Sequence, residues 1–331
     1  MAPATRCHHG RRAAGPSAER GIALVIVLWL TVMLTAIGGA FAFSMRGEAL
    51  AARNAVSLAQ VRAAADGAID RTVFELTRPR TTEAWKADGQ VRAWTDGAIR
   101  IVAKAVDETS RIDLNAAAEP LLRSLFVTIG ELDDVAAGAI VDAIVDWRDT
   151  DDLRRPNGAE AADYRAAGSN YTPSNRSFES VGELSRVLGV TPALYAKVAP
   201  ALTVHTRQRG INPLTAGRTV LLALPAATPE TVDAFIAARE EALAANLPVP
   251  PFPPAQGFGV GAAATWRVRA EATDADGVTF VREAVARATG DPRRPYAALL
   301  WSEGEQRSLP PATAPAAAPV SGATQTDASR S

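Results

Sequence analysis

One uncharged segment near the N-terminus limits what this 331-residue chain can be. Residues 21–45 contain no charged side chain. As an α-helix, a segment of that length spans about 37 Å at 1.5 Å per residue, more than the roughly 30 Å hydrocarbon core of a bilayer. The segment therefore predicts a helix that crosses a membrane with some tilt.

Two other interpretations of this segment remain open. Residues 40–42 (Ala-Phe-Ala) would suit cleavage of a secretory signal peptide, but the apolar region of such a peptide is only about 7–15 residues long. A buried core helix would not carry charged residues at both ends, as this segment does. We favour a retained transmembrane helix over residues 22–45.

The residues before this segment predict its orientation. Residues 1–20 hold four arginines against Glu19 alone, and basic flanks stay in the cytoplasm. We expect a single-pass inner-membrane protein with a cytoplasmic N-terminus and a periplasmic C-terminal part. Gly21 lies at the cytoplasmic edge and is followed at once by Ile22. This junction suits a peptidase that removes residues 1–21 and leaves the helix attached.

The helical pattern continues beyond the apolar segment. No proline occurs between residue 45 and Pro79. Apolar or small residues recur at spacings of three and four, at Leu58, Val61, Ala65, Ala68, Thr72 and Leu76. Such spacing places them on one face of a helix. Residues 46–77 are therefore predicted to be an amphipathic continuation of the membrane helix, with an apolar face for a sheet to cover.

The rest of the chain predicts an α+β fold, in which the long helix packs on a small antiparallel sheet and a large helical domain is inserted between strands. Strand patterns occupy residues 98–107, 265–271, 278–285 and 295–301, and Asp276-Gly277 predicts a tight turn. The expected divisions are 78–111 for the first part of the sheet, 112–247 for the helical domain, 248–305 for the remaining strands, and 306–331 for a disordered tail rich in Pro and Ala.

Residues of the usual catalytic types are scarce. The only cysteine is Cys7, and His205 is the only histidine beyond residue 9. Intrachain disulfides, Cys/His zinc sites and most histidine-based triads are thereby excluded. We expect His205 to be a loop or packing residue and the protein not to be an enzyme.

Acidic residues are concentrated between positions 131 and 163, which contain ten Asp or Glu residues and only three arginines. Asp149, Asp151 and Glu160 match positions one, three and twelve of an EF-hand, but Arg154 replaces the glycine of position six, so this is not an EF-hand. Oxygen ligands on a long loop favour a bound Ca²⁺, which would order it. The alternative is a solvated acidic loop with arginine salt bridges.

A second hypothesis concerns the short helices of the inserted domain. Residues 180–198 predict two helices that meet at Gly189, with Thr191 as N-cap and Pro192 at the first helical position. Helix–glycine–helix units occur in DNA-binding hairpins. However, residues 112–206 hold 14 acidic and eight basic side chains, which opposes contact with phosphates. We therefore expect no nucleic acid partner.

Several motifs together resemble the minor pseudopilin K family of type II secretion systems, also called general secretion pathway protein K. They are residues 19–29 (Glu-Arg-Gly-Ile-Ala-Leu-Val-Ile-Val-Leu-Trp), 112–117, 144–152, 156–160, 178–184, 195–204 and 210–213. The most specific is Trp-Arg-Asp at 147–149 followed by Asn-Gly-Ala-Glu at 157–160. The resemblance covers about residues 19–305.

This resemblance implies a biological role and processing. A prepilin peptidase would cut between Gly21 and Ile22, and the new amine would be methylated. The subunit would join the minor pseudopilins I and J and the inner-membrane secretion platform, and would help to initiate and cap the periplasmic pseudopilus. Related proteins bind calcium in the inserted domain. The candidate ligands here are Asp146, Asp149, Asp151, Asp152, Asn157, Glu160 and Asp163.

The fifth residue after the expected cleavage site gives this role a physical basis. It is Ile26, where most pseudopilins have a glutamate. A carboxylate in lipid is costly but can pair with the N-terminal amine of a neighbouring subunit. Ile26 cannot form that pair, which suits the end of a filament. The alternatives are a competence-type minor pilin whose hairpins contact DNA, and a single-pass periplasmic binding protein.

Overall fold

The computed structural model describes residues 19–78, 85–245, 247–255, 257–261, 264–291 and 293–305. The tail expected at 306–331 and most of the expected leader lie outside the described residues. By internal contacts the chain divides into two units, residues 1–59 and 60–331.

Helix α1 runs without a break over Glu19–Thr77. Its part in the first unit exposes large apolar side chains, such as Leu24, Trp29 and Phe43. From Ile22 onward it is long and apolar enough to cross a membrane. The helix ends at Thr77, as predicted from the pattern over residues 46–77.

In the second unit, the last turns of α1 pack on a sheet. Val61, Ala65, Ala68 and Ile69 are buried against apolar residues of the strands. They lie three and four positions apart, as a helix with one buried face requires. The predicted apolar face is therefore confirmed from Val61 onward.

The sheet has five antiparallel strands in the order β1-β2-β5-β6-β7. They are β1 (Asp88–Asp96), β2 (Ile99–Asp107), β5 (Thr265–Thr273), β6 (Thr279–Asp291) and β7 (Arg294–Glu303). The four predicted strands are confirmed, and the turn before β6 includes Gly277 with φ +85°. Strand β1 is an addition that the sequence patterns did not predict.

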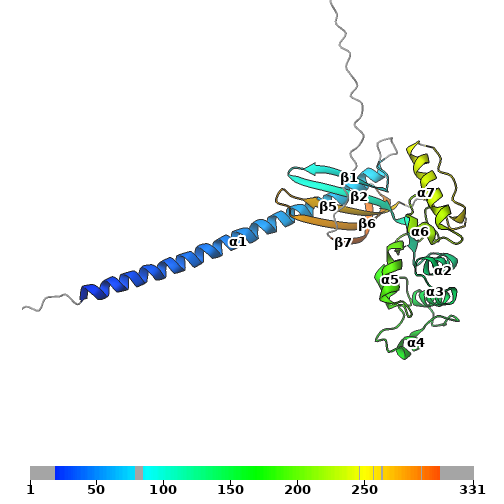
Figure 1. The fold of residues 1–331 in the computed structure, drawn as a ribbon, viewed down its shortest axis with the longest axis horizontal. Helices are drawn as coiled ribbons and strands as arrows, with labels where there is room; N and C mark the ends of the chain where they lie inside the picture. The colour runs from blue at the N-terminus through cyan, green and yellow to red at the C-terminus, as the bar shows by residue number, and fades with distance from the viewer. Residues whose placement is uncertain are drawn as a thin grey trace, which may run out of the picture. The chain divides into compact units, whose positions relative to one another are not determined.

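The helical domain leaves the sheet after β2 and returns before β5, and these two strands are direct neighbours in the sheet (Figure 1). Asp107, the last residue of β2, is paired with Trp266 of β5. An insertion of this kind leaves the sheet register intact, because both ends of the domain attach at the same end of two neighbouring strands. The predicted insertion between strands is confirmed.

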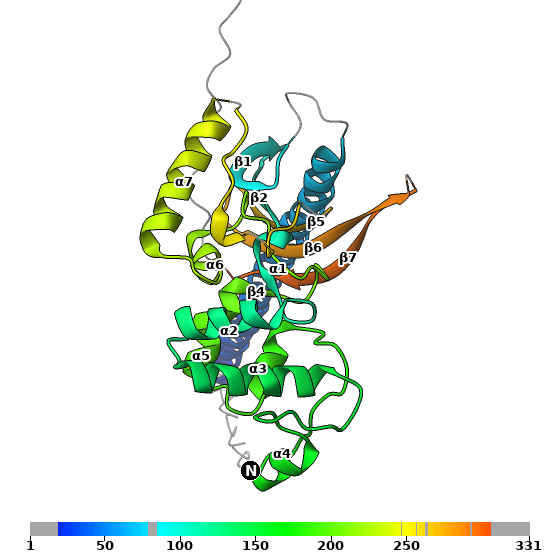
Figure 2. The same ribbon diagram turned by 90° about the vertical axis from the view of Figure 1, so that its right-hand side faces the viewer.

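Six α-helices and a short parallel pair of strands form the described part of this domain (Figure 2). They are α2 (Glu119–Thr128), α3 (Asp134–Arg148), α4 (Ala161–Ala166), α5 (Pro192–Val198), α6 (Arg218–Leu222) and α7 (Pro229–Ala244), with β3 (Ile112–Asp113) beside β4 (Leu202–Thr203). The domain has its own core, which includes the fully buried Leu121, Phe126 and Ile144. Four 3₁₀ turns lie at Glu108–Ser110, Val181–Arg186, Ala199–Ala201 and Pro253–Ala255.

The start of α5 follows the sequence closely. The Thr191 side chain accepts a hydrogen bond from the Leu194 N–H at 3.1 Å, and Pro192 is the first helical residue. Gly189 has φ +90°, a conformation that glycine adopts without strain. The preceding helical segment, Val181–Arg186, is a 3₁₀-helix.

Candidate functional site: an acidic loop and a polar junction

The acidic loop is anchored by a carboxylate at the end of α3. Asp146 is fully buried, and its oxygens accept the Arg155 N–H at 3.2 and 3.3 Å. Gly158 lies directly against it, because a Cβ at that position would stand 2.0 Å from Asp146 Oδ2. Burial raises the pKa of Asp146. The loop therefore folds back on α3, and only glycine fits at its closest approach.

Beside this anchor, several oxygens lack hydrogen-bond donors. Among the described residues, both oxygens of Glu160, Oδ1 of Asp149 and Oδ1 of Asn175 are buried without a partner. Glu160 is only 7% exposed. The Asp163 N–H donates to the Glu160 carbonyl at 2.8 Å, and the Asp163 carboxylate accepts the Glu160 N–H at 3.0 Å. An unpaired buried carboxylate is costly.

The pKa values of two carboxylates in the loop are raised, which indicates that positive charge is lacking around them. Burial, followed by the charges of Asp146 and Asp149, raises the pKa of Glu160 to about 6. Burial and the charge of Asp151 raise the pKa of Asp149. A cation at this point would stabilise both carboxylates in their charged form.

The other predicted ligands are engaged in local hydrogen bonds. The Asn157 amide donates to Asp142 at 3.3 Å, and Asp151 caps the Leu153 N–H at 2.8 Å. Asp163 accepts the Glu160 N–H and faces Arg154. The Asp163 carboxylate is therefore engaged at both oxygens and that of Asp151 at one, whereas the Asn157 contact uses the amide nitrogen.

Asn175 is a candidate that the sequence patterns did not single out. Its amide donates to Asp152 at 3.0 Å, and its own oxygen remains free. It lies 26 positions after Asp149, so no ligand spacing could have revealed it. Its φ of 46° is one that asparagine tolerates better than most residues.

These oxygens fit a hard divalent cation by chemistry, since carboxylate and amide oxygens are the ligands that Ca²⁺ prefers. In the described part of the chain, however, no three His, Cys, Asp or Glu side chains stand close enough together to form a complete metal-binding group. The unpaired oxygens mark where a cation would be held, and binding would require the carboxylates to draw closer.

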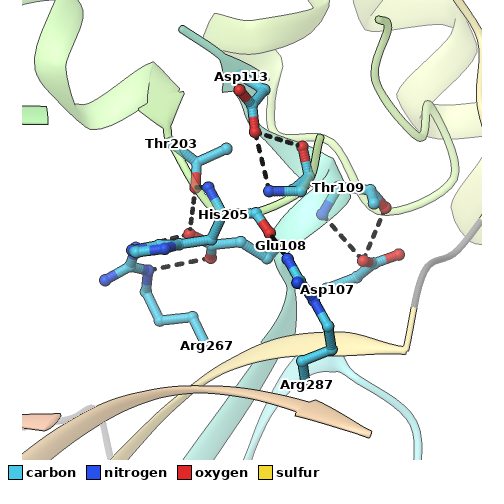
Figure 3. A network of polar contacts seen from close by, with 9 residues as sticks. Asp107, Glu108, Thr109, Asp113, Thr203, His205, Arg267 and Arg287 are labelled. Atoms are coloured by element: carbon cyan, nitrogen blue, oxygen red, sulfur yellow. Dashed lines mark hydrogen bonds and ion pairs between the residues drawn. The ribbon is translucent and has the colours of Figure 1, made fainter. Parts of the chain in front are cut away.

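A second polar cluster joins the sheet to the helical domain (Figure 3). Glu108, just after β2, is 1% exposed. Arg267 of β5 donates to both of its oxygens, at 2.6 and 3.1 Å, and the Thr203 hydroxyl donates to it at 2.7 Å. The ion pair therefore connects the sheet to β4 of the inserted domain.

Asp113, at the end of β3, is the most heavily used acceptor in this junction. Its Oδ1 accepts the N–H groups of Asn115 and Ala116. Its Oδ2 accepts the Thr206 N–H at 2.8 Å, the Thr206 hydroxyl at 3.0 Å and the Arg207 N–H at 2.9 Å. One fully buried carboxylate thus ties two segments that are 93 residues apart in sequence.

His205 belongs to the same junction, as the prediction of a loop or packing residue implies. Its backbone carbonyl accepts a hydrogen bond from Arg287 of β6, and its N–H donates to Thr203 (3.2 Å). Burial lowers the pKa of the imidazole, and the opposing charges of Glu108 and Arg267 follow in size.

His205 predicts a pH dependence of stability. Because its folded pKa is lowered, the unfolded chain takes up a proton near pH 6.5 before the folded chain does. The free energy of unfolding should therefore fall as the pH drops below about 6.5. His205→Gln should remove this contribution. Urea unfolding of both forms at pH 7.5 and 5.5 measures it, and equal pH dependence in the two would contradict it.

The architecture defines a class of protein. A long apolar N-terminal helix that continues onto an antiparallel sheet, with a helical domain inserted between strands, is the build of a pseudopilin. Residues 102–207 match the family described as type II secretion system (T2SS), protein K. The matching region runs from β2 through the acidic loop to the junction.

Curated relatives agree. Type II secretion system protein K of Klebsiella pneumoniae is 29% identical over 62% of this chain and 69% of its own length. Its namesake from Dickeya chrysanthemi is 35% identical over 29% of each chain. A chain of the GspK-GspI-GspJ complex of enterotoxigenic Escherichia coli superposes with a TM-score of 0.53 at 19% identity, over 79% of this chain and 99% of its own, which supports the fold. Residues 102–207 thus match a type II secretion system protein K domain, and the chain is similar to protein K of other bacteria.

Proposed function

We propose that this chain is a minor pseudopilin that helps to initiate and cap the tip of the periplasmic pseudopilus during export of folded proteins. The observation that carries the proposal is the joint presence of the apolar helix Ile22–Thr77 and the inserted domain, whose residues match the protein K family. The role is structural. Assembly would be driven by helix packing and by membrane contacts of α1.

Processing at the membrane is part of this proposal. Cleavage between Gly21 and Ile22, followed by methylation of the new amine, would leave α1 as a single-pass anchor in the inner membrane. N-terminal sequencing of the membrane fraction, with and without prepilin peptidase, tests it. A mature chain that begins at Ile22 only when the peptidase is present supports the proposal, and any other mature start contradicts it.

The place at the tip rests on Ile26 and on the inserted domain. Ile26 offers no carboxylate to the amine of a neighbour, so one of the contacts that extends a filament is missing. The inserted domain would add bulk to the end that carries it. Both features favour a terminal position over a repeated one.

The proposed partners are the minor pseudopilins of the I and J types, with the prepilin peptidase and the inner-membrane platform acting on the subunit before and during assembly. The support is the likeness of this fold to a chain of a GspK-GspI-GspJ complex. Co-purification of the three minor pseudopilins from solubilised membranes is the corresponding test.

We further propose that the acidic loop binds Ca²⁺. The unpaired oxygens of Asp149, Glu160 and Asn175 support this proposal. Of the other candidates, Asp146 and Asp152 lie beside these oxygens, while Asp151, Asn157 and Asp163 are held in local hydrogen bonds. When bound, the ion would supply positive charge that orders the loop.

Calcium should therefore stabilise the protein against heat. We expect added Ca²⁺ to raise the Tm by several degrees, because a ligand that binds only the folded state stabilises it. The double variant Asp149→Ala plus Glu160→Ala should abolish the shift. The matched control, Asp134→Ala plus Asp233→Ala, removes two carboxylates outside the loop and should retain it. A shift that survives the first double variant would remove the proposed site.

A nucleic acid partner is not favoured. The family match extends over the region that contains the helical hairpin, and acidic residues dominate that region. Phosphate contacts require a basic surface.

A further inference from the structure

An apolar groove lies along α7, outside the acidic loop and the junction. One wall is α7 itself, and the other is the proline-rich segment that leads back to β5; the two run side by side in Figure 2. The lining consists of five prolines, three phenylalanines, three alanines and one threonine. No charged side chain lines it among the described residues.

The floor of the groove is rigid and its rim is open. Phe235 of α7 and Phe252 are each 6% exposed, and their rings stack with centroids 4.5 Å apart. Phe258 is half-buried, and the prolines of the rim, such as Pro250 and Pro251, are exposed. Aromatic floors with small apolar rims are surfaces on which extended proline-rich segments dock.

The chain itself contains a segment of this chemistry. Residues 309–320 (Leu-Pro-Pro-Ala-Thr-Ala-Pro-Ala-Ala-Ala-Pro-Val) have four prolines and no charge. Prolines hold a chain extended, so little conformational freedom is lost when it docks. An uncharged segment also suits a groove without charged side chains.

The segment can reach the groove. Its starting point is fixed, because the Glu305 carbonyl accepts a hydrogen bond from Arg269 (2.5 Å) and the Gly304 N–H donates to Val281 (3.1 Å). Phe258 and Arg269 are eleven positions apart in the sequence, so their Cα atoms lie at most about 40 Å apart. The 15 residues from Glu305 to Val320 span about 46 Å at 3.1 Å each, so the segment reaches the groove even at that upper limit.

We propose that the C-terminal segment 309–320 docks intramolecularly in the groove between α7 and residues 250–258. The segment then covers apolar surface that the domain otherwise presents to solvent, on a face distinct from the acidic loop. The proposal is independent of the assignment to a secretion system.

Cross-linking in the full-length chain tests this docking. With Cys7 replaced by serine, cysteines are placed at Ala316 in the tail and at Ala234 in the groove, and a short bismaleimide is added. The matched control moves the second cysteine to Ala237, which is exposed on α7 but does not line the groove. A merely tethered tail would reach both positions alike, since its effective concentration is the same at both.

Docking predicts at least about five-fold more intramolecular product with Ala234→Cys than with Ala237→Cys. It also predicts that a synthetic peptide of residues 309–320, added in excess, removes that preference. Equal yields at the two positions would overturn the proposal. Products of twice the chain mass that prefer Ala234→Cys would overturn it as well, because they would assign the groove to the tail of a second copy.

Discussion

Replacing Asp113 by alanine is expected to lower the free energy of unfolding by roughly 4 kcal/mol. The fully buried carboxylate accepts five hydrogen bonds, from Asn115, Ala116, Thr206 and Arg207. Alanine would leave those donors without an acceptor, and an unsatisfied buried donor costs about 1–3 kcal/mol, although such costs do not add fully. Urea unfolding followed by tryptophan fluorescence measures the change.

Asp88→Ala is the matched control for this experiment. Asp88 also caps a backbone N–H, that of Gln90 at 3.0 Å, but it does so at an exposed position. Water can replace it there, so the control should change the unfolding midpoint little. Equal effects of the two substitutions would show that the Asp113 contacts do not hold the junction together.

Replacing Glu108 by alanine is the second substitution with a large expected effect, about 3–5 kcal/mol. The substitution would leave the Arg267 guanidinium without its carboxylate partner, although only a fifth of the Arg267 side chain is exposed. It would also leave the Thr203 hydroxyl without its acceptor. An uncompensated charge in such a place costs more than the pair contributes. The double variant Glu108→Ala plus Arg267→Met should therefore recover part of the loss.

An exposed ion pair gives the comparison. Glu131 and Lys197 are paired at 2.5 Å, but their side chains are 72% and 44% exposed, and such pairs contribute little. Glu131→Ala should leave the urea midpoint unchanged within error. If Glu108→Ala behaved in the same way, the buried pair would not link the sheet to the inserted domain.

Much of the fold could be predicted because its signals are local. The uncharged run at 21–45 and the apolar spacing after Val61 together indicate one long helix, and the structure has it. Asp276-Gly277 marked the hairpin between β5 and β6. Strand β1 was missed because Asp88–Asp96 is an edge strand whose polar and apolar residues do not alternate regularly.

The polar sites were harder to predict, because they depend on contacts between distant parts of the chain. The acidic loop was evident from its composition, but composition cannot show which carboxylates accept hydrogen bonds from the loop's own N–H groups. Asp151 and Asp163 serve local caps, whereas Glu160 remains unpaired. The junction depends on the parallel pairing of β3 with β4, which are about 90 residues apart, and nothing in either short strand predicts it.

The position of this subunit along an assembled pseudopilus tests the central claim most directly. Gold particles attached to a single tag on the inserted domain can be located by electron microscopy on pseudopili sheared from cells. We expect label at one end of each fibre, because we propose that a subunit with Ile26 in place of a carboxylate ends the filament. Label repeated along the shaft would contradict the account.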